Sequence, residues 1–221
     1  MLKAHYAEKL IEAGCDEVGR GCLAGPVVAA AVILPQGYVH PWLNDSKQLN
    51  PAQRLFLSST IKQVALAWAI GEASHEEIDQ LNILQAAYLA MHRAIGLLEQ
   101  PPELLLIDGN GFKPYQGIPH VCIIRGDAQF SAIAAASVLA KTHRDAYMRT
   151  LAGQFPGYYW EKNVGYPTPV HRRAIQQLGI TPYHRKTFRL VANHPDSTVN
   201  KSLNLNRTLQ AADKTMAEHA R

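Results

Sequence analysis

Cysteine is scarce in this 221-residue sequence, and its three copies form no recognisable pair. Cys15, Cys22 and Cys122 include no C-x-x-C spacing and are odd in number. That pattern argues against a disulfide framework or a structural zinc site, and it favours a reducing compartment. None of the ten histidines falls in an H-x-x-x-H or H-E-x-x-H spacing, so histidine-based zinc binding is not indicated either.

Long hydrophobic runs are also missing. The N-terminal stretch MLKAHYAEKLIEAG lacks the apolar core of a signal peptide. No run reaches the roughly 18 apolar residues that a membrane span needs. We therefore expect a soluble, cytoplasmic protein with no membrane partner.

The charge balance is mildly basic and excludes little. The 22 Lys and Arg outnumber the 18 Asp and Glu, which gives a formal net charge of +4. This excess suits a polyanionic partner, but many enzymes carry a similar one. The length fits one good-sized domain, or one domain with an appendage. The 47% apolar and 18% charged content is ordinary for a globular protein.

Segments typical of strands alternate with segments typical of helices. The strand patterns lie at 27–35, 65–73, 103–108 and 120–127, and the longer helix patterns at 51–64, 83–100 and 131–152. A short helix is expected to open at Ser74, and residues 165–179 are expected to form a turn and a further helix. Asn50-Pro51 and the capping box Ser74-x-x-Glu77 mark two helix starts. The alternation predicts an α/β fold with a mixed central sheet flanked by helices. Residues 192–221, rich in Asn, Ser and Thr, are expected to form a partly helical or flexible appendage to a domain of residues 1–191.

Acidic residues stand where the predicted strands end. Asp16 and Glu17 are adjacent, Asp108 follows LLLI, and Asp127 follows HVCIIRG. Strand ends of an open α/β sheet are where ligands bind. Clustered carboxylates repel one another, so we expect a hard divalent cation such as Mg²⁺ or Mn²⁺ between them. Neighbours on a strand face opposite sides, so Asp16 and Glu17 can share a site only if the strand ends or kinks there.

Each of these features also has a simpler interpretation. Asp127 could cap the helix after it, and Asp108-Gly109 could be only a turn. The basic residues could be solvated surface charges or phosphate contacts. They are Lys47, Lys141, His143, Arg144, His184, Arg185 and Lys186. Glycines beside the carboxylates would leave backbone groups open to a ligand.

Seven motifs in order resemble the ribonuclease HII family over roughly residues 10–190. They read DEVGRGCLAGPV, NDSKQL, EEIDQLNIL, LLLIDGNG, RGDAQFSAIAAASVLAKTHRD, GYPT and HRKTF. The resemblance implies a ribonuclease H-like fold that acts as a monomer in DNA replication and ribonucleotide excision repair. It implies cleavage of the RNA strand of RNA–DNA hybrids. It also implies incision 5′ to single ribonucleotides in duplex DNA, leaving 3′-hydroxyl and 5′-phosphate ends.

The resemblance also assigns residues. Asp16, Glu17, Asp108 and Asp127 would be catalytic and bind two Mn²⁺ or Mg²⁺ ions, with Asp16 between them. Gly19, Arg20 and Gly21 would meet the ribose 2′-hydroxyl through their backbone, and Tyr166 would stack on the neighbouring nucleotide. Lys47, His184 and Arg185 would be phosphate or positioning contacts. The implied reaction is two-metal phosphodiester hydrolysis.

Two positions depart from the family pattern. Val164 stands where the family usually has Lys, which removes one possible phosphate contact. Thr187 stands where the family has Ser, and it keeps the hydroxyl. Two other classes stay open from the residues themselves: another Mg²⁺-dependent phosphohydrolase, and a nucleic-acid-binding module without catalysis.

Overall fold

A computed structural model describes residues 2–43 and 49–191 of the chain. Met1–Leu190 belongs to one compact unit. The predicted contact Lys47 and the predicted appendage 192–221 lie outside the described residues. No helix in residues 2–43 or 49–191 is both long and apolar enough to cross a membrane.

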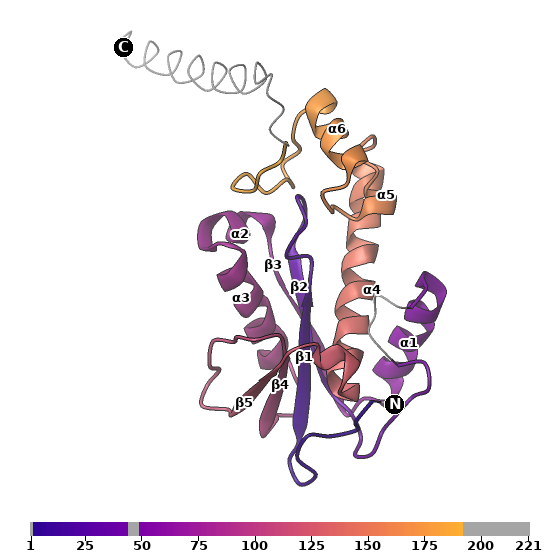
Figure 1. The fold of residues 1–221 in the computed structure, drawn as a ribbon, viewed down its shortest axis with the longest axis vertical. Coiled ribbons are helices and arrows are strands. Elements are labelled where there is room, and N and C mark those ends of the chain that lie inside the picture. Colours follow the sequence, from indigo (N-terminus) through magenta and orange to yellow (C-terminus); the bar gives the residue numbers. More distant parts are fainter. Residues whose placement is uncertain (1, 44–48, 192–221) are drawn as a thin grey trace. The chain divides into compact units, whose positions relative to one another are not determined.

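The core of the unit is a five-stranded mixed sheet in the order β3-β2-β1-β4-β5 (Figure 1). The strands are β1 (Glu12–Val18), β2 (Val27–Ile33), β3 (Ala67–Ala73), β4 (Leu104–Asp108) and β5 (His120–Ile123). β1, β2 and β3 pair antiparallel, whereas β4 runs parallel to both β1 and β5. The prediction of a mixed α/β sheet is therefore confirmed.

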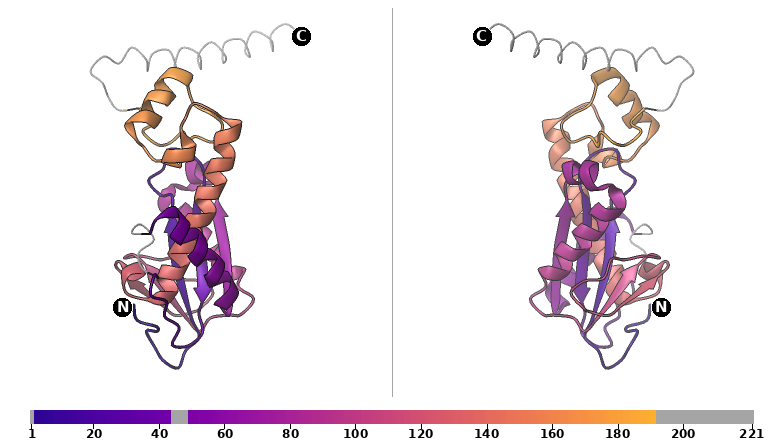
Figure 2. Two further views of the ribbon diagram at one scale, coloured as in Figure 1. Left: turned by 90° about the vertical axis from the view of Figure 1, so that its right-hand side faces the viewer. Right: turned by 90° about the vertical axis from the view of Figure 1, so that its left-hand side faces the viewer.

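Helices cover both faces of this sheet (Figure 2). They are α1 (Pro51–Val64), α2 (His75–Leu81), α3 (Ile83–Gly96), the 3₁₀ helix η1 (Gly126–Ala128), α4 (Ser131–Gln154), α5 (Trp160–Asn163) and α6 (Pro169–Leu178). α3 packs on one face, and α4 and α1 pack on the other. Both predicted helix starts are confirmed, because Asn50 and Ser74 each cap their helix in a capping box.

β2 shows why the middle of the sheet is apolar throughout. Its side chains alternate between the two helical layers, with Ala29 and Ala31 towards α3 and Val28 and Val32 towards α4. A strand that is buried on both faces needs a continuous apolar sequence, and VVAAAVI supplies it.

Gly14 lets α4 lie directly against β1. A Cβ atom at Gly14 would lie 2.2 Å from the backbone carbon of Ala132 and 2.3 Å from the nitrogen of Ile133. Only a residue without a side chain allows this approach. The contact brings the first turns of α4, including Ser137, over the strand that carries Asp16.

Candidate active site

Three aspartates meet at the carboxyl ends of the neighbouring strands β1 and β4, beside η1. Asp16, Asp108 and Asp127 each offer one carboxylate oxygen, and these oxygens lie within 4.8 Å of one another. Parallel pairing of β1 and β4 sets Cys15 opposite Ile107, so that the next residues, Asp16 and Asp108, come together. The backbone N–H of Gly126 donates to Asp108 Oδ1 at 2.7 Å, which fixes η1 and therefore Asp127 beside the strand.

The cluster is electrostatically strained. Asp16 is only 7% exposed. Burial raises the pKa of its carboxyl well above the usual range, and the charges of Glu17 and Asp108 raise this pKa further. A hydrogen bond with Ser137 of α4 acts in the opposite direction. A cation between these oxygens would relieve the repulsion, and a site made of carboxylate oxygens fits the hard ions Mg²⁺ and Mn²⁺.

Glu17 is not one of the three acids whose oxygens meet, but it lies close enough to Asp16 and Asp108 for their charges to interact. β1 keeps its register with β2 as far as Val18 opposite Val28 and ends there, directly before Gly19, where an end of the strand was expected. Consequently Asp16 and Glu17 point to opposite faces. Glu17 Oε1 instead accepts from Arg20 Nη1 at 3.0 Å. Burial raises the pKa of Glu17, and Arg20 opposes this shift.

The side chain of Arg185 binds the backbone of the glycine loop, residues 19–25, which follows β1. The guanidinium donates from Nη2 to Gly19 O at 2.7 Å, from Nη1 to Arg20 O at 2.9 Å and from Nε to Gly25 O at 3.0 Å. Gly19 and Gly25 have φ values of +94° and +79°, which favour glycine. The carbonyls therefore point to Arg185, whereas a Cβ atom at Gly21 would meet nothing within 4 Å, so the loop is open at Gly21.

Arg144 of α4 holds the end of the same loop. It donates from Nη2 to Ala24 O and from Nε to Pro26 O, both at 2.9 Å, and from Nη1 to Val164 O at 2.8 Å. Both arginine side chains are fully buried. A direct phosphate contact by Arg144 or Arg185 is therefore wrong for this structure, and of the two roles predicted for Arg185 only positioning remains. Burial lowers the pKa of Arg185 to about 10, so that it stays charged at neutral pH.

Tyr166 follows a tight turn at Val164 and Gly165, which have φ values of +42° and +87°. Its ring is partly exposed and lies 5.6 Å from Lys141 Nζ. Burial raises the pKa of Tyr166 to about 12, so its phenol stays protonated and can donate a hydrogen bond. The hydroxyl contacts the thiol of Cys22 in the glycine loop. Tyr166 is therefore next to the glycine loop, and its expected contact with a nucleotide stays a prediction.

His184 lies in the interior, and its predicted phosphate contact is also wrong for this structure. The side chain is fully buried, with Nδ1 accepting from the N–H of Thr181 at 2.9 Å and Nε2 lying 3.2 Å from Nε2 of His171. His171 and Ser137 were not among the residues expected at the site. Ser137 meets Asp16 from a distant part of the chain, whereas His171 contacts Trp160, Tyr166 and His184 within 13 residues, and no motif predicts these contacts.

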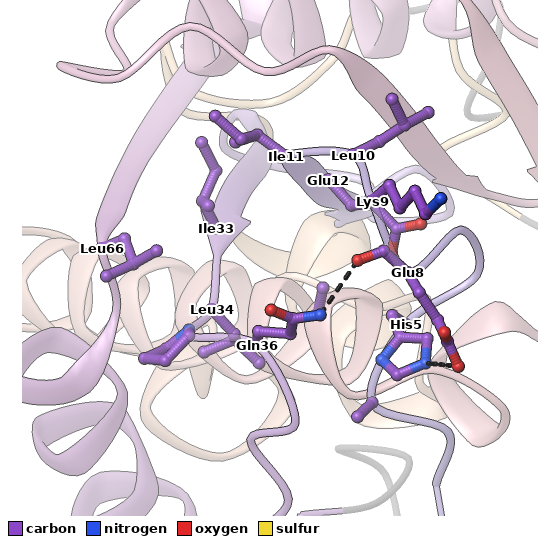
Figure 3. Close-up of a pocket in the computed structure, with 13 residues that line it drawn as sticks. His5, Glu8, Lys9, Leu10, Ile11, Glu12, Ile33, Leu34, Gln36 and Leu66 are labelled. Carbon is purple, nitrogen blue, oxygen red and sulfur yellow. Dashed lines mark hydrogen bonds and ion pairs between the residues drawn. The ribbon is translucent and has the colours of Figure 1, made fainter.

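A cavity of about 200 Å³ lies at the other end of β1, near Glu12, and at the end of β2, near Ile33 (Figure 3). Gln36 crosses it to donate to the carbonyl of Glu8 at 3.0 Å. None of the three clustered aspartates lines it, so it is separate from the acidic site.

Comparison with known proteins agrees with this geometry. The family model of Ribonuclease HII matches residues 13–191. The Ribonuclease HII of Parabacteroides distasonis is 58% identical over 191 residues, which cover 86% of this chain and 96% of the relative. That of Bacteroides fragilis is 58% identical over 193 residues, covering 87% and 96%. The crystal structure of the ribonuclease H2 from Pyrococcus horikoshii OT3 matches with a TM-score of 0.68 at 25% identity, covering 81% of this chain and 94% of that one.

The mixed sheet, with the acidic cluster at the carboxyl ends of β1 and β4, defines a nuclease with a ribonuclease H-like fold. Nucleases of this class are metal-dependent hydrolases. Within that class, the chain belongs to the ribonuclease HII family, and it is an endoribonuclease.

Proposed function

We propose that this ribonuclease, which cleaves the RNA strand of RNA–DNA hybrids, also incises duplex DNA 5′ to a single embedded ribonucleotide. The observation that carries the proposal is the position of the acidic cluster. The cluster lies at the end of the same strand, β1, that leads into the arginine-held loop. The loop that would recognise the ribose therefore begins at Gly19, only three positions after Asp16, which would take part in cleavage.

Asp16, Asp108 and Asp127 would hold the divalent ions, and Glu17 would join them once a cation competes with Arg20 for its carboxylate. Two bound Mg²⁺ or Mn²⁺ ions would supply Lewis-acid activation of the attacking water and stabilisation of the leaving oxygen. The Ser137 hydrogen bond and the Gly126 N–H would keep Asp16 and Asp108 oriented towards the substrate phosphate.

The glycine loop would recognise the ribose. The N–H groups of Arg20 and Gly21 have no hydrogen-bond partner within residues 2–43 and 49–191, whereas the carbonyls of Gly19 and Arg20 are held by Arg185. A 2′-hydroxyl both donates and accepts hydrogen bonds, and it is the group that tells RNA from DNA. The Tyr166 phenol would add a donor and its ring a surface for stacking.

The test uses three duplexes with matched sequence: all DNA, DNA with one ribonucleotide, and an RNA–DNA hybrid. With Mg²⁺ or Mn²⁺ we expect cuts in the last two only, with the single-ribonucleotide cut on the 5′ side. Chelator should abolish both. Cleavage of the hybrid without cleavage at the single ribonucleotide would refute the proposal, and equal cleavage of the all-DNA duplex would refute ribose recognition.

A further inference from the structure

The positive charge of this protein is concentrated in one part of the chain. Residues 162–191 contain six Lys and Arg and no Asp or Glu, so they carry +6. Because the whole chain carries +4, the remaining residues together carry −2. The basic stretch begins in α5 and includes Tyr166 and α6. Arg185 is buried, so five of the six cations can contribute to a surface. A surface with such an excess of positive charge is typical of one that binds a polyanion.

α5 and α6 enclose a groove of about 720 Å³ within this basic stretch. Lys162 and Arg173 line it, and no Asp or Glu does. Both basic side chains are exposed, and neither takes part in an ion pair with any residue that the structure describes. The ring of Tyr159, 47% exposed, lies in the same wall. The groove therefore offers two free cations and one exposed aromatic ring.

The groove is continuous with the turn that carries Tyr166. The carbonyl of Asn163 accepts from the N–H of Tyr166 at 2.9 Å, and Thr168 N–H donates to the carbonyl of Tyr166 at 2.8 Å. Asn163 and Thr168 also line the groove. A nucleic acid that meets Tyr166 is thus already at the entrance to the groove.

We propose that the α5–α6 groove binds the duplex that flanks the cleaved nucleotide, with Lys162 and Arg173 on backbone phosphates and Tyr159 against a sugar or base. This inference rests on the proposed function, because it assumes that the nucleotide lies at Tyr166. Cation contacts to phosphates release counterions and make binding depend on salt, whereas they carry no sequence information.

The experiment measures binding in the Asp108→Asn background, so that the substrate stays intact. Two duplexes are used, each with one ribonucleotide. In one, about one helical turn of 10 base pairs extends on the 5′ side of the ribonucleotide, and in the other it extends on the 3′ side. The Lys162→Gln/Arg173→Gln variant should bind one of the two at least ~10-fold more weakly, and the slope of log K against log salt should fall by about 2. The matched control is Lys9→Gln/Lys113→Gln, which removes two exposed cations outside the groove.

Equal affinity and slope for the groove variant and the control would overturn the groove proposal. The proposal is also wrong if the groove variant binds both duplexes normally but no longer binds a protein that the unaltered protein binds. In that case the groove is a protein-binding site. Failure of the unaltered protein to cut at a single ribonucleotide would refute the proposed function, and this outcome is read in a separate assay.

A second inference comes from the buried pair His171 and His184. Trp160 Nε1–H can only donate, and it lies 2.9 Å from His171 Nε2. His171 therefore carries its proton on Nδ1, which donates to the carbonyl of Tyr166 at 2.9 Å. The N–H of Thr181 donates to His184 Nδ1, so the proton of His184 lies on Nε2 and points to His171 Nε2.

These hydrogen bonds form a directed chain from Thr181 through both imidazoles to the backbone of Tyr166. The chain requires both rings to be neutral, because a second proton on His171 would face two donors. Charged and titratable groups near the pair oppose protonation, with Arg172 acting on His171 and His75 of α2 acting on His184. Burial, the largest cause, lowers the pKa of both residues, to about 4 for His184.

We infer that His171 is a positioning residue that fixes the Tyr166 backbone relative to the glycine loop. The residue after His184 is Arg185, which holds that loop. The histidine chain therefore links the two parts of the protein that would meet the ribose. This inference also rests on the role of Tyr166 in the proposed function.

Two measurements test the positioning role. Side-chain ¹H–¹⁵N correlation spectra of the unaltered protein at pH 6.5 should show one neutral Nδ1–H and one neutral Nε2–H histidine in the interior. Charged rings, or the opposite tautomers, would refute the inference without any variant.

The second measurement compares His171→Asn with His171→Leu. The Asn amide can still donate near the Nδ1 position, whereas Leu cannot. We expect His171→Leu to raise KM for the single-ribonucleotide duplex by ~10-fold and His171→Asn to restore most of it. Equal loss in both variants, or equal loss on hybrid and single-ribonucleotide substrates, would show a purely structural role.

Discussion

The acidic cluster and the arginine-held loop bury charge in opposite ways. In the cluster, Asp16 lies among other acids, and burial and their charges raise its pKa, whereas a hydrogen bond with Ser137 lowers it. In the loop, the charges of Arg144 and Arg185 are satisfied by backbone carbonyls. A bound cation would balance the first arrangement, whereas the second is complete in the chain itself. Catalysis and recognition should therefore respond differently to the same kinds of change.

Replacing Asp108 by Asn tests the acidic cluster and should have the largest effect. The amide keeps the shape and removes a charged metal ligand, so cleavage in Mg²⁺ should fall by at least ~10²-fold. Initial rates on the single-ribonucleotide duplex measure this. Activity near that of the unaltered protein would mean that the three aspartates are not the catalytic centre.

Replacing Arg185 by Lys tests the loop. Lysine keeps the charge but cannot reach three carbonyls at once, and leaving buried carbonyls without partners should cost about 2 kcal/mol of unfolding free energy. Urea unfolding measures the loss. The control is Arg172→Lys, since Arg172 also donates to two carbonyls but on a more exposed surface, and its change should stay within ~0.5 kcal/mol. Similar losses in both variants would contradict the special role of Arg185.

Tyr166 tests recognition without altering either buried charge. Tyr166→Ala loses a stacking surface, worth roughly 1–3 kcal/mol. Tyr166→Phe loses one hydrogen bond, worth roughly 0.5–1.5 kcal/mol. The alanine variant should harm single-ribonucleotide cleavage more than hybrid cleavage. If it melts at lower temperature and loses both substrates equally, Tyr166 is a packing residue.

Replacing Asp16 by Asn tests, through the melting temperature, whether the charge of the acidic cluster destabilises the protein when no cation is bound. The folded-state pKa of Asp16 is raised, so its ionisation costs stability as pH rises, and the cost disappears below the unfolded pKa. In chelator, the amide should therefore raise Tm at pH 8, have little effect at pH 4, and lose its advantage when Mg²⁺ is added. A lower Tm in chelator at pH 8 would show that the cluster is not electrostatically strained.

Truncation after Ala192 should have the smallest effect. Residues 193–221 contain none of the family motifs, so hydrolysis of a short duplex should be unchanged within error. Loss of folding in a thermal melt would mean that the predicted boundary at residue 192 is wrong.

The sequence predicted the fold and the acidic cluster well because both depend on local patterns. Strand and helix periodicities, two capping signals and acids at successive strand ends all lie within short windows. The predicted helix 83–100 ends early, at Gly96. Gly96 also lies against Tyr115, since a Cβ atom there would lie 2.8 Å from the Tyr115 hydroxyl, and the sequence window does not show this contact.

The surroundings of the cluster could not be predicted, for the same reason. Arginines are usually exposed, and no local pattern marks Arg144 or Arg185 as buried. For His184 and Arg185, a phosphate or positioning role is what the family resemblance implies, and it says nothing about their burial. Arg185 and Arg20 are 165 residues apart in the chain, and no local pattern shows that one holds the other. The orientation of Glu17 also depended on pairing with β2, which keeps β1 regular.

Gly14 has a consequence for engineering this enzyme. A methyl group there would act as a spacer between β1 and α4, since a Cβ atom at that position falls within 2.2 Å of the Ala132 backbone. Moving α4 away from β1 would increase the distance between Ser137 and Asp16 without replacing any acidic residue. Position 14 sets how closely α4 packs on the sheet, and therefore how close Ser137 lies to the acidic cluster, without contributing a side chain to the cluster.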